Sequence, residues 1–159
     1  MKNYIIENGK IVLKNKVIED HYLVVTNRKI EAITTNIEKF KDYSKINAQG
    51  GYVTPGFVEL HIHGCAQFGF ELNEKNILEK AAEFLKTKGI NTFIPTIQCD
   101  ESVLQRISRQ IIENKSLAKN IPGIYIEGPF INEHERGGIN LNRIRKPNIK
   151  YLKKIIDLS

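Results

Sequence analysis

Two histidines and one glutamate stand where they could hold a metal ion. His61 and His63 are two residues apart in the run PGFVELHIHG, and Glu127 directly follows the apolar residues Ile124-Tyr125-Ile126. Successive side chains of a strand point to opposite faces, so a strand from Phe57 to His63 would present both imidazoles on one face. Two neutral imidazoles and a carboxylate are ordinary ligands of a divalent metal ion.

A plainer interpretation exists for each of these residues. The histidines could be a pair on an exposed strand, and Glu127 could be a strand-end carboxylate in solvent. Two features favour the metal site: the strand face opposite the histidines is wholly aliphatic, as expected under covering helices, and a buried Glu127 would be costly without a cation. The aliphatic residues are Val58, Leu60 and Ile62. We therefore expect the three polar side chains to share a cavity at the carboxyl ends of adjacent parallel strands.

Alternating strands and helices are predicted to position these residues. The first predicted helix covers about residues 73–88, with Asn73 as its cap and Gly89 at its end. Residues 90–97 form a second buried strand, and Asp100 is placed to cap the helix that follows. The apolar faces of the two helices consist of Ile77, Leu78, Ala81, Ala82 and Leu85, and of Val103, Leu104, Ile107 and Ile111.

A third unit begins with a strand that runs from Pro122 or Gly123 to Glu127. A long loop follows, and Pro147 is placed at the first turn of a helix that reaches the end of the sequence. Three βα units predict an α/β fold with a parallel sheet, either open and doubly wound or part of a (β/α)8 barrel. A barrel typically needs about 250 residues, so this chain would contain only its first three βα units.

A smaller β-rich segment precedes these units. Strands 4–6 and 11–13 flank Asn8-Gly9, and strands 22–26 and 30–34 flank Asn27-Arg28-Lys29, which predicts two hairpins in a small antiparallel domain. The glycines and proline of GGYVTPG mark the boundary after it. We therefore divide the chain into a β-domain, residues 1–54, and a truncated barrel domain, residues 55–159.

Composition restricts the class of protein. The 159 residues are 41% hydrophobic, which is enough for a core. The sequence has no apolar run of membrane-spanning length and no secretory signal, so we expect a cytoplasmic protein that binds no membrane. Cys65 and Cys99 lack CxxC spacing and should be reduced. The net charge of +6 comes from scattered basic residues, with clusters at 143–146 and 150–154 that read as a solvated helix face. No nucleic-acid partner is indicated, whereas the charge suits an anionic sugar phosphate.

The combination of PGFVELHIHG with IEGPFINEHERGG resembles the N-acetylglucosamine-6-phosphate deacetylase family of the amidohydrolase superfamily, over essentially the whole chain. EGPF is the more telling motif, because H-x-H after PGF is shared by many amidohydrolases. The resemblance implies a β-sandwich built from both chain ends and a metal-dependent (β/α)8 barrel. It implies hydrolysis of the acetamide of N-acetylglucosamine 6-phosphate to glucosamine 6-phosphate and acetate.

The resemblance also implies roles for particular residues. Glu127 matches the metal-ligand glutamate, and His61 and His63 match a pair that binds a second metal in some members, so one or two ions are expected, zinc first and iron as an alternative. Gly138 and Ile139 match a loop that contacts the sugar, where the family commonly has a small residue and then histidine. Glu59 stands where the superfamily usually has aspartate.

The remaining functional residues of the family would lie beyond Ser159. These are two later histidine ligands and the catalytic aspartate, so no catalytic residue is assigned within the chain, and the chain alone is expected to be inactive. Complete members are expected to be homo-oligomers. Two alternatives stay open: another amidohydrolase that acts on a cyclic amide, or a non-catalytic truncated remnant that associates through its open strand edges.

Overall fold

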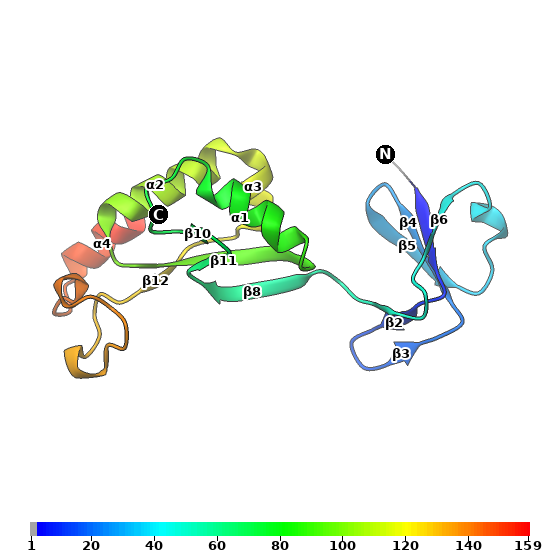
Figure 1. Ribbon diagram of the computed structural model, residues 1–159, viewed down its shortest axis with the longest axis horizontal. Coiled ribbons are helices and arrows are strands. Elements are labelled where there is room, and N and C mark those ends of the chain that lie inside the picture. Colours follow the sequence, from blue (N-terminus) through cyan, green and yellow to red (C-terminus); the bar gives the residue numbers. More distant parts are fainter. Residues whose placement is uncertain (1–2) are drawn as a thin grey trace. The chain divides into compact units, whose positions relative to one another are not determined.

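The computed structural model describes residues 3–159 and divides into two compact units, Met1–Pro55 and Gly56–Ser159 (Figure 1). Each unit has its own sheets, and each is described by itself. Within the described residues, no helix is both long and apolar enough to cross a membrane.

The first unit contains two sheets, and the chain passes from one sheet to the other. The first sheet has the order β5-β4-β1-β6 and the second has the order β3-β2-β7. Ile5 and Val24 are fully buried in this unit. The strands are β1 (Tyr4–Glu7), β2 (Lys10–Val12), β3 (Val17–Ile18), β4 (Tyr22–Thr26), β5 (Lys29–Thr34), β6 (Ser44–Asn47) and β7 (Tyr52–Val53), with the short 3-10 helix η1 (Glu38–Phe40) before β6.

The hairpin predicted at Asn8-Gly9 is wrong. Strand β1 pairs with β4 and β6, and β2 pairs with β3 and β7, so the chain passes from one sheet into the other at this bend. Asn8 has a φ of 54°, and a Cβ on Gly9 would lie 2.5 Å from Cγ2 of Val53. The bend is therefore closely packed against Val53, and β2 continues into the second sheet. Because β6 and β7 run parallel to their partners, the sheets are mixed and not purely antiparallel.

The second predicted hairpin is confirmed. Strands β4 and β5 are antiparallel, with Tyr22 opposite Thr34 and Thr26 opposite Lys29. The residues between them, Asn27 and Arg28, have φ values of 50° and 66°. Positive φ at both central positions is the conformation that matches the twist of a two-residue hairpin turn.

The second unit has a parallel sheet with the order β12-β11-β8, formed by β8 (Phe57–Ile62), β11 (Ile90–Gln98) and β12 (Tyr125–Glu127). Its helices lie on one face of this sheet (Figure 1). A small antiparallel pair, β9 (Gly64–Cys65) and β10 (Phe68–Gly69), follows β8. The helices are α1 (Ile77–Lys86), α2 (Glu101–Glu113), α3 (Lys115–Asn120) and α4 (Ile149–Leu158), with the 3-10 helices η2 (Glu133–Glu135) and η3 (Leu141–Arg143) in the loop after β12.

The first helix begins later than predicted. Helix α1 starts at Ile77, and the residue before it is Asn76, which has a φ of 57° and makes no side-chain cap. Asn73 is therefore not a cap, because the chain still turns there: the backbone N–H of Glu74 donates to the carbonyl of Leu72. The predicted apolar face is confirmed, since all five of its residues are buried.

The later helices confirm one predicted cap and correct another. The Asp100 side chain accepts hydrogen bonds from the backbone N–H groups of Ser102 and Val103, as predicted for the start of α2. The last helix is instead capped by Asn148, which accepts from the N–H of Tyr151, so Pro147 lies just before the helix and not in its first turn. Helix α3 was not predicted.

The core of this unit lies between the helices and the sheet. Ile62 on β8 and Ile126 on β12 pack against it, so by strand alternation the histidines and Glu127 point to the opposite, helix-free face. The prediction that helices cover Val58 and Leu60 is wrong, because the exposed fractions of these residues are 58% and 62%. Strand β8 is an edge of the sheet, and the helices of the described chain do not extend over these two residues.

Candidate metal centre

The structure brings His61, His63 and Glu127 together on the face of the sheet opposite the helices. Oε1 of Glu127 lies 3.0 Å from Nε2 of His61 and 3.4 Å from Nε2 of His63. The prediction of neighbouring strands needs correction, because β11 lies between β8 and β12. The carboxylate therefore reaches across the end of β11 to meet both imidazoles.

The spacing of these atoms fits a small divalent cation. One ligand atom from each residue can be chosen so that all lie within 4.8 Å of one another. Zinc binds nitrogen and oxygen at about 2.0–2.1 Å in tetrahedral geometry, which places neighbouring ligand atoms about 3.3 Å apart. The two distances from Glu127 are close to that separation. The donor set and these two separations therefore fit a small divalent cation.

The centre is open to solvent. The side chains of His61 and His63 are each 48% exposed, and that of Glu127 is 23% exposed. The three groups thus converge on an open sheet face and not in a closed cavity. Such exposure leaves space for a water molecule or a substrate group beside a bound ion.

Two further side chains contact the backbone or ring of His61. The Glu59 carboxylate accepts a hydrogen bond from the backbone N–H of His61 at 3.0 Å, two residues further along the same strand. The centroid of the Tyr125 ring lies 4.9 Å from that of the His61 ring. The centroid of the His63 ring lies 5.3 Å from that of the His61 ring. Sequence reasoning missed Tyr125, although its position two residues before Glu127 on one strand would have placed both on one face.

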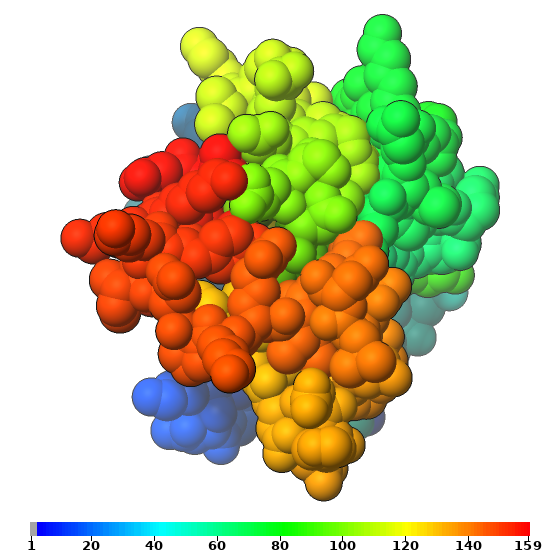
Figure 2. All heavy atoms as spheres, turned by 90° about the vertical axis from the view of Figure 1, so that its left-hand side faces the viewer, coloured from blue at the N-terminus to red at the C-terminus, as the bar shows by residue number. Residues whose placement is uncertain are grey.

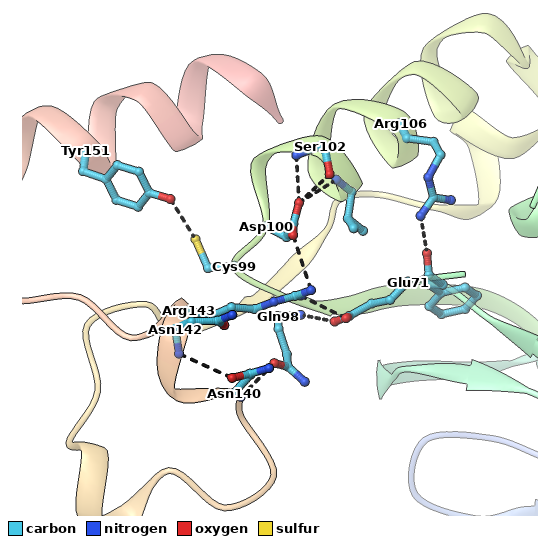
Figure 3. Close-up of polar contacts among 12 residues, drawn as sticks. Glu71, Gln98, Cys99, Asp100, Ser102, Arg106, Asn140, Asn142, Arg143 and Tyr151 are labelled. Atoms are coloured by element: carbon cyan, nitrogen blue, oxygen red, sulfur yellow. Dashed lines mark hydrogen bonds and ion pairs between the residues drawn. The ribbon is translucent and has the colours of Figure 1, made fainter. Parts of the chain in front are cut away.

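A second polar cluster, centred on Arg143, lies at the carboxyl end of β11 (Figure 3). The Arg143 guanidinium lies 2.9 Å from a Glu71 oxygen and 3.3 Å from an Asp100 oxygen. The other Glu71 oxygen accepts from the backbone N–H of Gln98 at 2.7 Å, and the Gln98 side-chain oxygen accepts from the N–H of Asn140 at 3.0 Å. We call these five residues the Arg143 cluster. Sequence reasoning had placed Arg143 on a solvated face.

The Arg143 cluster binds the loop that carries the predicted sugar-contacting residues to the end of β11. The loop segment that includes η2 and η3 forms part of the surface coloured orange in Figure 2; in it, Gly138 is exposed and Ile139 is half-buried. The backbone N–H of Ile139 donates to the carbonyl of Arg136 at 3.1 Å, and the Arg136 guanidinium donates to the carbonyl of Ile139. Asn140 then ties this turn to Gln98, which pairs in register with Glu127. The loop is thereby held beside the strand ends that carry the centre.

Local contacts set the pKa of several nearby groups. The hydroxyl of Ser102, at 2.6 Å, together with the Val103 N–H and the Arg143 charge, holds the pKa of Asp100 below its ordinary value. Cys65 and Cys99 are both free, as predicted, and burial raises the pKa of each thiol. Neither cysteine is therefore favoured as a thiolate ligand.

The fold is an α/β fold that resembles the solved structures of N-acetylglucosamine-6-phosphate deacetylases. The crystal structure of N-acetylglucosamine-6-phosphate deacetylase from Pasteurella multocida superposes with a TM-score of 0.83 at 24% identity, covering 98% of this chain and 42% of that one. No known protein-family profile matches the chain.

Sequence relatives carry the same name. The chain is 28% identical to N-acetylglucosamine-6-phosphate deacetylase of Haemophilus influenzae, over 84% of this chain and 36% of the relative, and 27% identical to that of Bacillus subtilis, over 96% and 41%. A dihydroorotase of Staphylococcus epidermidis is 28% identical over 65% of this chain and 26% of its own length. The chain thus spans well under half of the deacetylases it matches, and its resemblance to them is confirmed.

Proposed function

We propose that this chain forms the metal-binding part of a deacetylase that hydrolyses the acetamide of N-acetylglucosamine 6-phosphate to glucosamine 6-phosphate and acetate. The observation that carries the proposal is the convergence of His61, His63 and Glu127 in a chain whose relatives bear that name. The fold proposed with it is a small β-domain, residues 1–54, followed by the first three units of a (β/α)8 barrel, residues 55–159.

The proposed role of the three side chains is to hold the ion and fix its position. Each imidazole donates the lone pair of Nε2, and Glu127 donates a carboxylate oxygen. A divalent cation bound there, zinc in the first place and iron as an alternative, polarises a carbonyl and lowers the pKa of bound water. Because Glu127 is committed as a ligand, it does not also act as the general base. The resemblance assigns that task to an aspartate in a longer polypeptide.

The loop with Gly138 and Ile139 is proposed to contact the sugar. Its backbone is held beside the strand ends by Asn140, so Ile139 is placed to offer apolar contact where the family commonly offers an imidazole. The net charge of +6 favours an anionic sugar phosphate through long-range attraction. A homo-oligomer is proposed for the polypeptide that contains the whole site.

The proposal is tested by turnover in two forms of the protein. The 159-residue chain and a longer polypeptide that carries it together with the later strands of the deacetylases are loaded with zinc and given N-acetylglucosamine 6-phosphate. We expect acetate release only from the longer polypeptide, because general acid–base assistance alone is typically worth about 10²–10⁴ in rate. Glu127→Gln should abolish it, and Glu83→Gln, at an exposed position of α1, should not.

Dihydroorotate and N-acetylgalactosamine 6-phosphate serve as competing substrates in the same assay. Dihydroorotate is included because relatives of that name match the chain, and a cyclic-amide hydrolase is the second candidate function. If the dihydroorotate ring is opened faster than acetate is released from N-acetylglucosamine 6-phosphate, the second candidate function is favoured over the proposed one. A longer polypeptide that binds zinc but turns over none of these substrates would support a non-catalytic remnant.

A further inference from the structure

Few protein groups hold the imidazole rings of the candidate centre in place. A ligating imidazole almost always donates its second ring N–H to a carboxylate, a carbonyl or water, which fixes the ring orientation. Within residues 3–159, the Nδ1 atoms of His61 and His63 make no hydrogen bond to protein. Both side chains are also half-exposed, so burial does not hold the rings in place.

The ring of Tyr125 contacts the ring of His61. The rings of Tyr125 and His61 are 4.9 Å apart between centroids, with an interplanar angle of 58°. Tilted arrangements at this separation are favourable between aromatic rings. Strands β8 and β12 are two strand spacings apart, about 9–10 Å, so the two side chains must extend toward each other above β11. Thr96, which pairs with Tyr125 on β11, is fully buried.

The contact orders the rings in a row. Tyr125 lies against His61, and the His61 ring lies 5.3 Å from that of His63, with Glu127 within 3.0 Å of the first and 3.4 Å of the second. Because Tyr125 and Glu127 are two residues apart on one short strand, the same strand supplies both a ligand and the group that orients another ligand. Tyr125 is 47% exposed, so core packing does not account for its position.

We propose that Tyr125 is a positioning residue that holds the His61 imidazole in the orientation needed to bind the metal ion. This inference rests on the proposed function for the existence of the metal centre. The rings of Tyr125 and His61 make the contact, so the proposal assigns the effect to the aromatic ring and not to the hydroxyl. Tyr125 acts on His61 and not on His63, whose ring lies beyond it.

The test uses the 159-residue chain and Co²⁺ as the probe, with visible absorption reporting the ligand field and calorimetry reporting affinity. Tyr125→Leu should weaken Co²⁺ binding about two- to tenfold, the range expected for one aromatic contact, and should alter the absorption band. Tyr125→Phe should restore the affinity and spectrum of the unchanged chain. Tyr52→Leu, at a tyrosine that is 70% exposed in the other unit, is the matched control and should have no effect. Should Tyr125→Leu fail to fold, Tyr125→Val keeps a residue suited to strands.

A double-mutant cycle separates positioning from general stability. In a His61→Ala background the effect of Tyr125→Leu on Co²⁺ affinity should vanish, whereas in a His63→Ala background it should remain. Equal effects in both backgrounds, or unchanged affinity and spectrum in Tyr125→Leu, would overturn the inference while the metal centre stands. If the unchanged chain binds no Co²⁺, the proposed metal centre fails and this inference fails with it.

Discussion

Two polar clusters lie at the carboxyl end of the same three-stranded sheet, and they are built differently. In the Arg143 cluster, one guanidinium lies between two carboxylates, and the remaining carboxylate oxygens accept backbone or hydroxyl hydrogen bonds (Figure 3). In the candidate centre, one oxygen of Glu127 lies between two half-exposed imidazoles.

The difference indicates which cluster stabilises the fold and which is suited to a ligand. The Arg143 cluster joins the loop after β10, the end of β11, the start of α2 and η3, so its groups fasten elements to one another. The candidate centre joins only β12 to the end of β8, and its possible ligand atoms lie within 4.8 Å of one another. Removal of a group should therefore lower stability in the first cluster and metal affinity in the second.

The largest expected effect is on the metal affinity of the candidate centre. Glu127→Gln should weaken Zn²⁺ or Co²⁺ binding by more than about 100-fold, because loss of an outer-shell partner alone typically costs 10–100-fold. The free energy of unfolding of the metal-free chain should change by less than about 0.5 kcal/mol, since the carboxylate is partly exposed. Calorimetry and urea unfolding measure the two quantities, with Glu83→Gln as control. Unchanged metal stoichiometry would make Glu127 structural.

The opposite pattern is expected for Arg143. Arg143→Met should lower the free energy of unfolding by about 1–2 kcal/mol, because it leaves two partly buried carboxylates close together without their cation. Co²⁺ affinity should stay within about twofold, because none of the three proposed ligands contacts Arg143. Arg109→Met, at an exposed position of α2, is the matched control. A large loss of Co²⁺ affinity with unchanged stability would mean that the two clusters are one functional unit.

A smaller effect on stability is expected at Asp100, where two variants distinguish its role as a helix cap from that of its negative charge. Asp100→Ala should cost about 1 kcal/mol of stability, because two N–H groups at the start of α2 lose their acceptor. Asp100→Asn keeps an acceptor there and should cost less, so the difference between the two variants measures the cap. Thermal unfolding at neutral pH is sufficient for this comparison. Equal losses would assign the whole effect to the charge next to Arg143.

The smallest expected effect is a dependence of the free energy of unfolding on pH, which should be seen only in acidic solution. Because the pKa of Asp100 is depressed in the folded chain, its carboxylate stabilises the fold above the pKa of the unfolded state, and this contribution is lost as pH falls through the folded value. The advantage of the unchanged chain over Asp100→Asn should thus be constant near neutral pH and should decline as the pH falls below about 4. Urea unfolding at several pH values measures it. A difference that grows on acidification would contradict the assigned shift.

Much of the candidate centre could be predicted from the sequence because its signals are local. Strand alternation alone placed His61 and His63 on one face, and the strand-end position of Glu127 placed it at the same end of a parallel sheet. The cap at Asp100 depends on groups two and three residues away and was predicted for the same reason. In the smaller unit, the turn at Asn27-Arg28 was predicted correctly from the two strand-like runs that flank it, and both residues have positive φ.

The predictions that failed depend on which distant segments meet. Asn8-Gly9 has the composition of a hairpin turn, but the strands on either side of it pair with distant segments, β6 and β7, and belong to different sheets. The cover expected over Leu60 depended on which strand lies at the edge of the sheet. Neither fact has a signal in the nearby sequence.

The sequence by itself determined the alternating strands and helices, the faces of each element and the types of the ligand residues. Only the tertiary structure decided that Glu127 reaches both histidines across β11, that Tyr125 lies against His61, and that Arg143 meets a glutamate 72 residues earlier in the chain. Backbone geometry and side-chain alternation act over a few residues and are visible in the sequence. The order of strands in a sheet is set by the packing of the whole core, and with it the partners of every long polar side chain.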